Sequence, residues 1–504
     1  MIRDYFSGLS KKTFHAGTLT YTLAGLYGLF FWLLWGDFCF ALMNGIWKTI
    51  LPLQIKALEM PNWVIGVIVI SIPSTLNVIL NPIISTASDR TRSRWGRRRP
   101  FMLFATPFIS LFLCLMGFSS DIGHWLYSGA LGQLSGWSLG AITVGVIGLS
   151  VFLFYTADLF VSTVFYYFFN DVVPVAVMAR FLALFRMVGT GAGALYSYFI
   201  FPHALEHMKA IFFGAAAIYF AGFVMMCLVV KEGNYPDPKP LAKSTRNPFA
   251  LALAYVKECT HQKIFILLYI HMVIWTLANV GSGIYGMFVN LSLGLSMQNI
   301  GTIAAFVGVA TVILTYPAGV FADRFHPMRL MIWIKLAITI ITPFGFIWLF
   351  TEFSTSVNFW VVLGISSVNL ALMVIYQATT LPLLMRLFPR ESYGQYCSFN
   401  AICQAAVGAA GGFLVGYFLD TMRVHFPDAI YGKDYFYRLI VAWDLFFSAL
   451  SLLFLTLLYK EWLRLGRPGE KSDGEVFAET SARTSGIMRN SAMNCSAPQN
   501  PPVL

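Results

Sequence analysis

The stretch that decides the fold is "STASDRTRSRWGRRRPF", from Ser85 to Phe101. It packs six arginines and the single acid Asp89 between two strongly apolar runs. Each run is about as long as a membrane-spanning helix, which needs about 20 mostly apolar residues. A short arginine-rich loop between two such runs is typical of the cytoplasmic side of a multi-span membrane protein.

The overall composition indicates lipid as the solvent of this chain. Of 504 residues, 58% are hydrophobic and only 11% are charged, whereas soluble domains carry roughly 25% charged residues. The net charge of +11 follows from the basic loops, and no basic stretch stands apart from the apolar segments, so we expect no nucleic-acid partner. The seven cysteines are scattered without a CxxC pair, so neither a disulfide framework, a metal site nor a cofactor is expected.

Apolar windows divide the chain into twelve expected spans. Their approximate ranges are 28–54, 62–87, 98–118, 143–169, 176–201, 208–230, 264–291, 299–321, 328–350, 356–385, 393–419 and 437–459. We therefore expect a cytoplasmic N-terminal segment at 1–27, a cytoplasmic central loop at 231–263 and a disordered cytoplasmic tail at 461–504. Residues 119–141 are expected to form an outer loop with an interfacial helix.

The distribution of basic residues predicts the orientation. The richest loops follow spans 2, 6, 8, 10 and 12, and Lys/Arg-rich short loops stay in the cytoplasm. Both termini are therefore expected inside, in a cell membrane such as a bacterial inner membrane. The chain is expected to work as a monomer.

The two parts of the chain repeat one another. "STASDR" (Ser85–Arg90) ends span 2 and "GVFADR" (Gly319–Arg324) ends span 8. "NDVVPVAVMAR" (Asn170–Arg180) joins spans 4 and 5, as "RLFPRESYGQ" (Arg386–Gln395) joins spans 10 and 11. This pattern predicts an all-α membrane fold of 6+6 pseudo-symmetric helices, with bundles at 28–230 and 264–460. Substrate sites of such carriers lie near the bilayer midplane, between the halves.

These motifs resemble a known family of carriers. The Asp-Arg loops resemble the signature of the major facilitator superfamily, although Ser85 replaces its usual first glycine, which Gly319 keeps. "TRSRWG" followed by "RRPF", with "GDFCFA" (Gly36–Ala41) and "NPIISTASD" (Asn81–Asp89), resembles the glycoside–pentoside–hexuronide:cation symporters of the melibiose permease type and the sucrose–proton symporters. The resemblance implies a secondary transporter for a sugar or glycoside that works by alternating access. It also implies that loop charges hold the halves in one access state, here Asp89, Arg90, Arg97, Arg98, Arg99, Asp323 and Arg324.

Ionisable residues inside spans are costly and indicate function. By resemblance, Asp37 matches a carboxylate that accepts hydrogen bonds from sugar hydroxyls; the alternative is a structural salt bridge, for example to Arg186. Melibiose-type symporters hold sodium with acids where this chain has Asn77 and Asn81, so sodium coupling at that site is not expected. The alternative role of these amides is hydrogen bonding between helices.

A proton is the coupling ion we expect. Asp158 in span 4 facing Arg186 in span 5 could release its proton when the arginine approaches, and the sucrose–proton symporters also carry an acid in helix 4. A static ion pair is the alternative. Coupling is therefore expected through Asp158 or Asp37.

The second half offers amides and one tryptophan. Amides suit an uncharged polyhydroxylated substrate, and Trp275 either stacks on a sugar ring or is a packed aromatic. Asp444 is expected near the outer interface and is assigned no role. The substrate-lining candidates are Asp37, Asn44, Lys48, Asn77, Asn81, Tyr166, Arg186, Trp275, Asn279, Gln377, Asn400 and Gln404.

Taken together, these patterns predict a proton-coupled sugar or glycoside symporter. A carrier of the same fold for a drug, nucleoside, peptide or organic acid, or a uniporter, is the alternative, because fold does not determine substrate. An enzyme is not expected, because no HExxH, GxSxG or P-loop motif occurs in the sequence.

Overall fold

Twelve membrane-length helices make up the structure, a computed structural model that describes residues 13–129, 136–234, 255–389 and 393–466. The first six spans contain α2 (Leu23–Ala57), α3 (Asn62–Gly66), η1 (Val67–Ser71), α4 (Ile72–Arg90), α5 (Arg99–Gly117), α8 (Leu139–Val172), α9 (Val175–Leu195), η2 (Tyr196–Ile200), η3 (Phe201–His203) and α10 (Met208–Val229). The last six contain α12 (Lys263–Val280), α13 (Ser282–Met287), η4 (Phe288–Ser292), α14 (Met297–Asp323), α15 (Pro327–Ile341), η5 (Thr342–Phe346), α16 (Ile347–Phe350), α17 (Thr355–Leu387), α18 (Tyr393–His425), η7 (Tyr435–Leu439) and α20 (Ile440–Arg464). The hairpin β1 (Phe14–Ala16) and β2 (Leu19–Tyr21), α6 (Ser119–Ser128) and α19 (Asp428–Tyr431) lie outside the spans.

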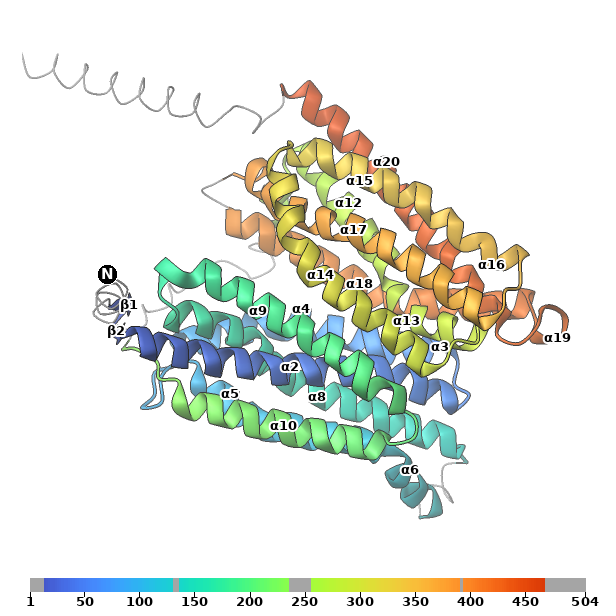
Figure 1. Ribbon diagram of the computed structural model, residues 1–504, viewed down its shortest axis with the longest axis horizontal. Coiled ribbons are helices and arrows are strands. Elements are labelled where there is room, and N and C mark those ends of the chain that lie inside the picture. Colours follow the sequence, from blue (N-terminus) through green and yellow to red (C-terminus); the bar gives the residue numbers. More distant parts are fainter. Residues whose placement is uncertain (1–12, 130–135, 235–254, 390–392, 467–504) are drawn as a thin grey trace, which may run out of the picture.

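The predicted all-α, twelve-helix 6+6 architecture is confirmed. Figure 1 shows the first six spans, blue to green, as one group and the last six, yellow to red, as a second group beside it. Within the first group α5 packs on α8 and α10, and within the second α12 packs on α18 and α20. We call these groups the N-terminal and C-terminal halves. The helix α6 falls in the stretch expected to be an outer loop with an interfacial helix, whereas the expected tail lies almost wholly outside the described residues.

Local sequence explains where several spans begin. Thr22, Ser138 and Ser296 precede α2, α8 and α14, and each hydroxyl accepts a hydrogen bond at 3.2 Å from the backbone N–H three residues on. Such N-caps satisfy donors that the helix itself leaves unpaired. The helices behind these caps are apolar around most of their circumference, because one face meets lipid and the other meets protein.

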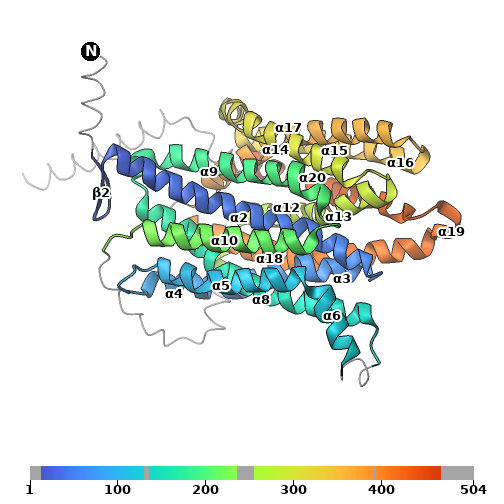
Figure 2. The same ribbon diagram turned by 60° about the horizontal axis from the view of Figure 1, so that its bottom comes forward.

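The halves meet most closely at one end. We call the end with Arg90 and Arg99 the linker end, and the opposite end, with Ala57 and His425, the far end. Figure 1 shows the ribbons of the halves converging at the far end and diverging toward the linker end, and Figure 2 shows the same helices turned by 60°. At the far end α3 and η1 pack on α18, and α14 packs on α9, η2 and η3.

Glycines allow this close approach. A Cβ on Gly66 would overlap the backbone carbonyl oxygen of Gly412, and a Cβ on Gly301 would overlap that of Ser197. Both pairs join one half to the other, so only glycine fits at these helix crossings. The far end is therefore closed by backbone contact as well as by side chains.

Candidate functional site

A cavity of about 290 Å³ lies between the halves, just inside the closed far end. Lys48 and Thr49 of α2 and Tyr196 of η2 line it from the N-terminal half, and Ser282 and Met287 of α13 line it from the C-terminal half. The Tyr196 hydroxyl and Thr49 Oγ1 are 2.5 Å apart. This hydrogen bond fixes two hydroxyl groups on the cavity wall.

A larger cavity of about 400 Å³ lies inside the C-terminal half and adjoins the first, because Ser282 lines both. Its polar lining consists of Asn279, Ser282, Thr342, Ser366, Asn369, Asp444 and Ser448, and its aromatic lining of Trp275, Tyr285 and Trp348. Hydroxyls, amides, one carboxylate and aromatic rings around a few hundred cubic ångströms form a typical small-molecule pocket.

A buried charge pair stands at the wall of this second cavity. Lys335 of α15 is fully buried, and its Nζ lies 3.1 Å from Ser448 Oγ and 3.1 Å from the centre of the Trp275 ring. Asp444 of α20 is within electrostatic range of Lys335, and its Oδ1 is shielded from solvent without a hydrogen-bond partner in the described part of the chain. The Lys335 ammonium covers one face of the Trp275 indole, so a sugar could stack only on the other face.

The N-terminal half holds two buried carboxyl groups. Asp37 and Asp158 are each 3% exposed, and each has one buried oxygen that finds no hydrogen-bond partner among the described residues. Asp158 lies in the electrostatic range of Lys48, which lines the first cavity. Asp37 packs against Gly189 of α9, where an added Cβ would lie 3.1 Å from its Oδ2.

The comparisons with known proteins decide the family. The family model described as MFS/sugar transport protein matches residues 33–461, which is most of the chain. The chain belongs to this family. It is therefore a multi-pass transporter and not an enzyme.

Curated relatives of this transporter match over a short stretch only. The sucrose transport protein SUT1 of Oryza sativa subsp. japonica is 43% identical over 47 residues, which is 9% of this chain and 9% of that protein. The general alpha-glucoside permease of Schizosaccharomyces pombe is 45% identical over 51 residues, 10% of this chain and 9% of that protein.

Solved structures agree with the fold. The nucleoside transporter NupG matches with a TM-score of 0.58 and 13% identity, over 86% of this chain and 98% of that one. A D-xylose-proton symporter matches with a TM-score of 0.56 and 15% identity, over 84% of this chain and 97% of that one.

The structure brings some of the predicted site residues of the transporter together. Tyr166 of α8 is within electrostatic range of both Asp37 and Arg186. Among the described ion pairs, none joins Arg186 to Asp37 or to Asp158. The cation near Asp158 is Lys48 of α2 instead, which is itself one of the predicted substrate-lining residues.

The predicted amides occupy several different places. Asn77 and Asn81 bond to each other at 3.1 Å on α4, and Asn44 bonds to the Phe40 carbonyl and the Trp47 indole. Asn279 lines the larger cavity. Gln404 accepts a bond from the Thr276 hydroxyl, Gln377 is exposed, and the buried Oδ1 of Asn400 has no partner in the described residues.

The linker-end charges form a network within the N-terminal half. Arg97 and Arg98 both bind the carboxylate of Asp171, and Arg98 also binds Asp89. The Glu232 carboxylate accepts the backbone N–H groups of Arg97, Arg98 and Arg99 at the start of α5. In the second half Arg324 is exposed, and the side chain of Asp323 lies outside what the structure describes.

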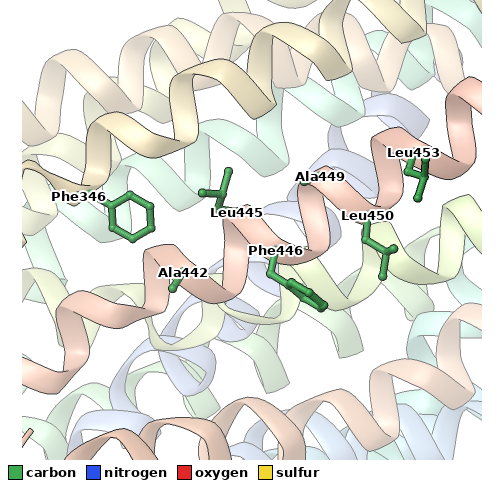
Figure 3. Close-up of a pocket in the computed structure, with 7 residues that line it drawn as sticks. All are labelled: Phe346, Ala442, Leu445, Phe446, Ala449, Leu450 and Leu453. Atoms are coloured by element: carbon green, nitrogen blue, oxygen red, sulfur yellow. The ribbon is translucent and has the colours of Figure 1, made fainter.

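A third hollow, of about 480 Å³, faces away from these sites. Figure 3 shows its lining side chains along α20 and at Phe346, and all of them are apolar. Phe446 and Leu453 are 63% and 51% exposed. Such a surface suits contact with lipid chains rather than a polar solute.

Sequence reasoning missed Lys335 and assigned Asp444 no role. The signal for Lys335 was present, because a lysine within an apolar span is itself a functional indicator. For Asp444, the position along the span gives no sign of Lys335, because that neighbour lies on a different helix. His271 of α12 is fully buried and is enclosed by hydrogen bonds to Tyr376 and to Ser451.

Proposed function

We propose that the protein is a proton-coupled sugar or glycoside symporter that works by alternating access. It would lie in a cell membrane with both termini cytoplasmic and act as a monomer, since one chain supplies the whole site. The observation that carries the proposal is the pair of adjoining cavities that share Ser282 and carry polar groups on mainly apolar walls, beneath a far end that is closed. A solute bound there is shielded from the far side while the halves diverge toward the linker side.

The lining favours an uncharged, hydroxyl-rich solute. Amides such as Asn279 and Asn369 and hydroxyls such as Ser282 each both donate and accept hydrogen bonds, which matches the alternating donors and acceptors of a sugar. Membership of a sugar transport family supports the same substrate class. The sucrose transport protein and the glucoside permease, each similar to this chain over about a tenth of its length, are consistent with it.

Proton coupling is supported by the buried carboxyls. Asp37 and Asp158 have unsatisfied oxygens within the membrane zone, and an ionised carboxylate there is costly. Protonation of Asp37 or Asp158 cancels that charge. The protonated and ionised forms would therefore favour different arrangements of the helices. Asn77 and Asn81 hydrogen bond to each other, and neither supplies the negative charge that a sodium site uses.

The test is uptake into proteoliposomes with imposed gradients. Radiolabelled sucrose, maltose and methyl glucosides should accumulate when a proton gradient is applied, and a sodium gradient alone should have no effect. Asp158→Asn should abolish accumulation but keep sugar exchange between the two sides, which needs no proton. Asp121→Asn is the matched control, because Asp121 pairs with Lys209 on an exposed surface.

Two results would contradict the proposal. Uptake driven by sodium and indifferent to pH would rule out proton coupling. Uptake of nucleosides or organic acids with no uptake of any sugar would rule out the substrate class.

A further inference from the structure

We propose that Asp444 is the ligand anchor of the C-terminal half and that, with Lys335 as its counter-charge, it restricts transport to uncharged sugars. This inference rests on the proposed function and refines it, because it excludes sugars that carry an acid group. It concerns the two charged residues that neither the motifs nor the resemblance points to.

The first observation is the unequal access of the two charges. Asp444 lines the larger cavity, whereas Lys335 is fully buried and does not line it. The ammonium sits behind Trp275 and Ser448, with its Nζ 3.1 Å from both the ring centre and the hydroxyl oxygen. A ligand in the cavity therefore meets the carboxylate directly and the ammonium only through this wall.

The second observation is the unpartnered, solvent-shielded oxygen of Asp444, which marks a carboxylate that the described protein groups do not satisfy. Its Oδ1 is buried without a hydrogen-bond partner in the described part of the chain, although a buried polar atom normally has one. Gly281 faces this oxygen, and an added Cβ there would lie 2.6 Å from it. The glycine thus leaves room for the carboxylate at this position.

The chemistry of a carboxylate selects the ligand group. An ionised carboxylate only accepts hydrogen bonds, so it pairs with hydroxyl donors of a sugar. Loss of one hydrogen bond to a charged acceptor lowers affinity roughly 10- to 100-fold. Asn279 and Asn369 line the same cavity and can complete the pairing of neighbouring hydroxyls.

The charge balance explains the exclusion of acidic sugars. Lys335 offsets Asp444, so the empty site is close to neutral, and any charged ligand would unbalance it. An anionic ligand has a further penalty, because the group it meets first is the carboxylate. A uronate or a sugar phosphate should therefore bind far more weakly than its neutral counterpart.

The experiment compares matched ligands on the purified full-length protein in liposomes. Methyl glucoside and methyl galactoside are each paired with the corresponding methyl uronide, and KM is measured for all four. We expect the wild-type KM of each uronide to exceed that of its neutral partner at least 10-fold. Asp444→Asn should raise the KM of the neutral sugars about 10-fold or more and bring the uronide-to-sugar ratio close to one.

Variants at Lys335 separate a role at the site from a role in folding. Lys335→Met/Asp444→Asn removes both charges, so it should melt within a few degrees of the wild type. Its uronide-to-sugar KM ratio should fall below that of the wild type but stay above one, because the carboxylate is gone while the site is still neutral. Lys335→Met alone should also lower the uronide-to-sugar KM ratio. Without the ammonium Asp444 would take up a proton, because burying an uncompensated carboxylate costs more than protonating it. A neutral Asp444 does not repel the uronide. A purely structural role of Lys335 would reduce uptake of both ligands equally. Asp428→Asn is the control, because Asp428 pairs with Arg423 in the same half.

The outcomes distinguish this inference from the proposed function. Equal wild-type KM values for a sugar and its uronide overturn the charge restriction, and this comparison needs no variant. If Asp444→Asn changes neither the sugar KM nor the uronide-to-sugar KM ratio, Asp444 is not the ligand anchor, but the proposal of sugar transport is unaffected. A wild-type protein that transports none of the four ligands, nor sucrose or maltose, overturns the proposed function itself.

Discussion

The carboxylate of Asp420 joins the two halves at the far end, and its removal should favour the opposite access state. Asp420 of α18 accepts hydrogen bonds from the Asn62 backbone N–H at 3.0 Å, from Asn62 Nδ2 at 2.7 Å and from the Trp63 backbone N–H at 2.9 Å. The Tyr437 hydroxyl donates to Asn62 Oδ1 at 2.6 Å. We call these four bonds the far-end latch. They must break before the far end can open, so Asp420→Asn should increase the population that is open there.

The size of the effect follows from these bonds. A hydrogen bond to a charged acceptor contributes about 1.5–3 kcal/mol. Asparagine keeps one acceptor oxygen but loses the charge and one acceptor, so we count one such bond, ~2 kcal/mol. A negative charge at the start of a helix adds about 0.3–1 kcal/mol, and Asp420 lies at the start of α3. The total of ~2–3 kcal/mol corresponds to a shift of about 30- to 150-fold toward the far-open state.

The assay uses a thiol that is covered only while the far end is closed. Ser71 lies between the halves, with its Oγ buried and unpartnered in the described residues and close to Gly412 of α18. Ser71→Cys should react slowly with maleimide in the parent and at least 10-fold faster when combined with Asp420→Asn. Asp428→Asn is the matched control, because this far-end aspartate pairs with Arg423 inside one half.

The reasoning fails if labelling of the cysteine at position 71 stays within twofold of the parent in Asp420→Asn. It also fails if Asp428→Asn accelerates labelling as much as Asp420→Asn does. The effect would then come from loosening of the segment around α19 and not from loss of the far-end latch. Loss of sugar exchange without faster labelling would indicate a damaged site and not a shifted equilibrium.

Three further changes have definite expected outcomes. Gly66→Ala should separate α3 from Gly412 and so raise the rate of thiol labelling at the far end while lowering uptake; an unchanged rate would show that the helices slide past the added methyl group. Asp171→Asn removes the carboxylate that Arg97 and Arg98 share, while Arg98 keeps Asp89, and should cost about 3 kcal/mol, the lower end for breaking a buried ion pair, seen as a fall in melting temperature. Glu232→Gln weakens the cap of α5 by about 1–2 kcal/mol and should lower the melting temperature less than Asp171→Asn does; the reverse order would refute the ranking of buried ion pair over cap.

The sequence could predict the spans because their signal is local. Each apolar run carries its own length and its own flanking charges, and the Asp-Arg repeats at Ser85–Arg90 and Gly319–Arg324 mark the second helix of each half. The observed spans extend a few residues beyond most of the predicted ranges. Caps such as Ser138 add turns that hydropathy alone does not detect.

The pairing of charges could not be predicted in the same way. Asp158 was matched to Arg186 by type and by helix order, but the structure places Lys48 near it. All three residues lie on different helices, so helix order alone does not determine which cation lies near the acid. Likewise, Tyr437 and Asn62 are 375 residues apart, so no local pattern connects them.

The distribution of charge suggests how the transporter moves between its states. In this conformation the far-end latch joins the halves, whereas Arg97, Arg98 and Asp171 at the linker end bond inside one half. The linker-end network therefore survives separation of the halves and does not oppose it. Asp89 is 55% exposed although it binds Arg98, so its carboxylate retains capacity for a partner from the C-terminal half. When the latch opens, new bonds to Asp89 would offset the lost ones, and the two access states would then differ by only a few kcal/mol, as repeated cycling requires.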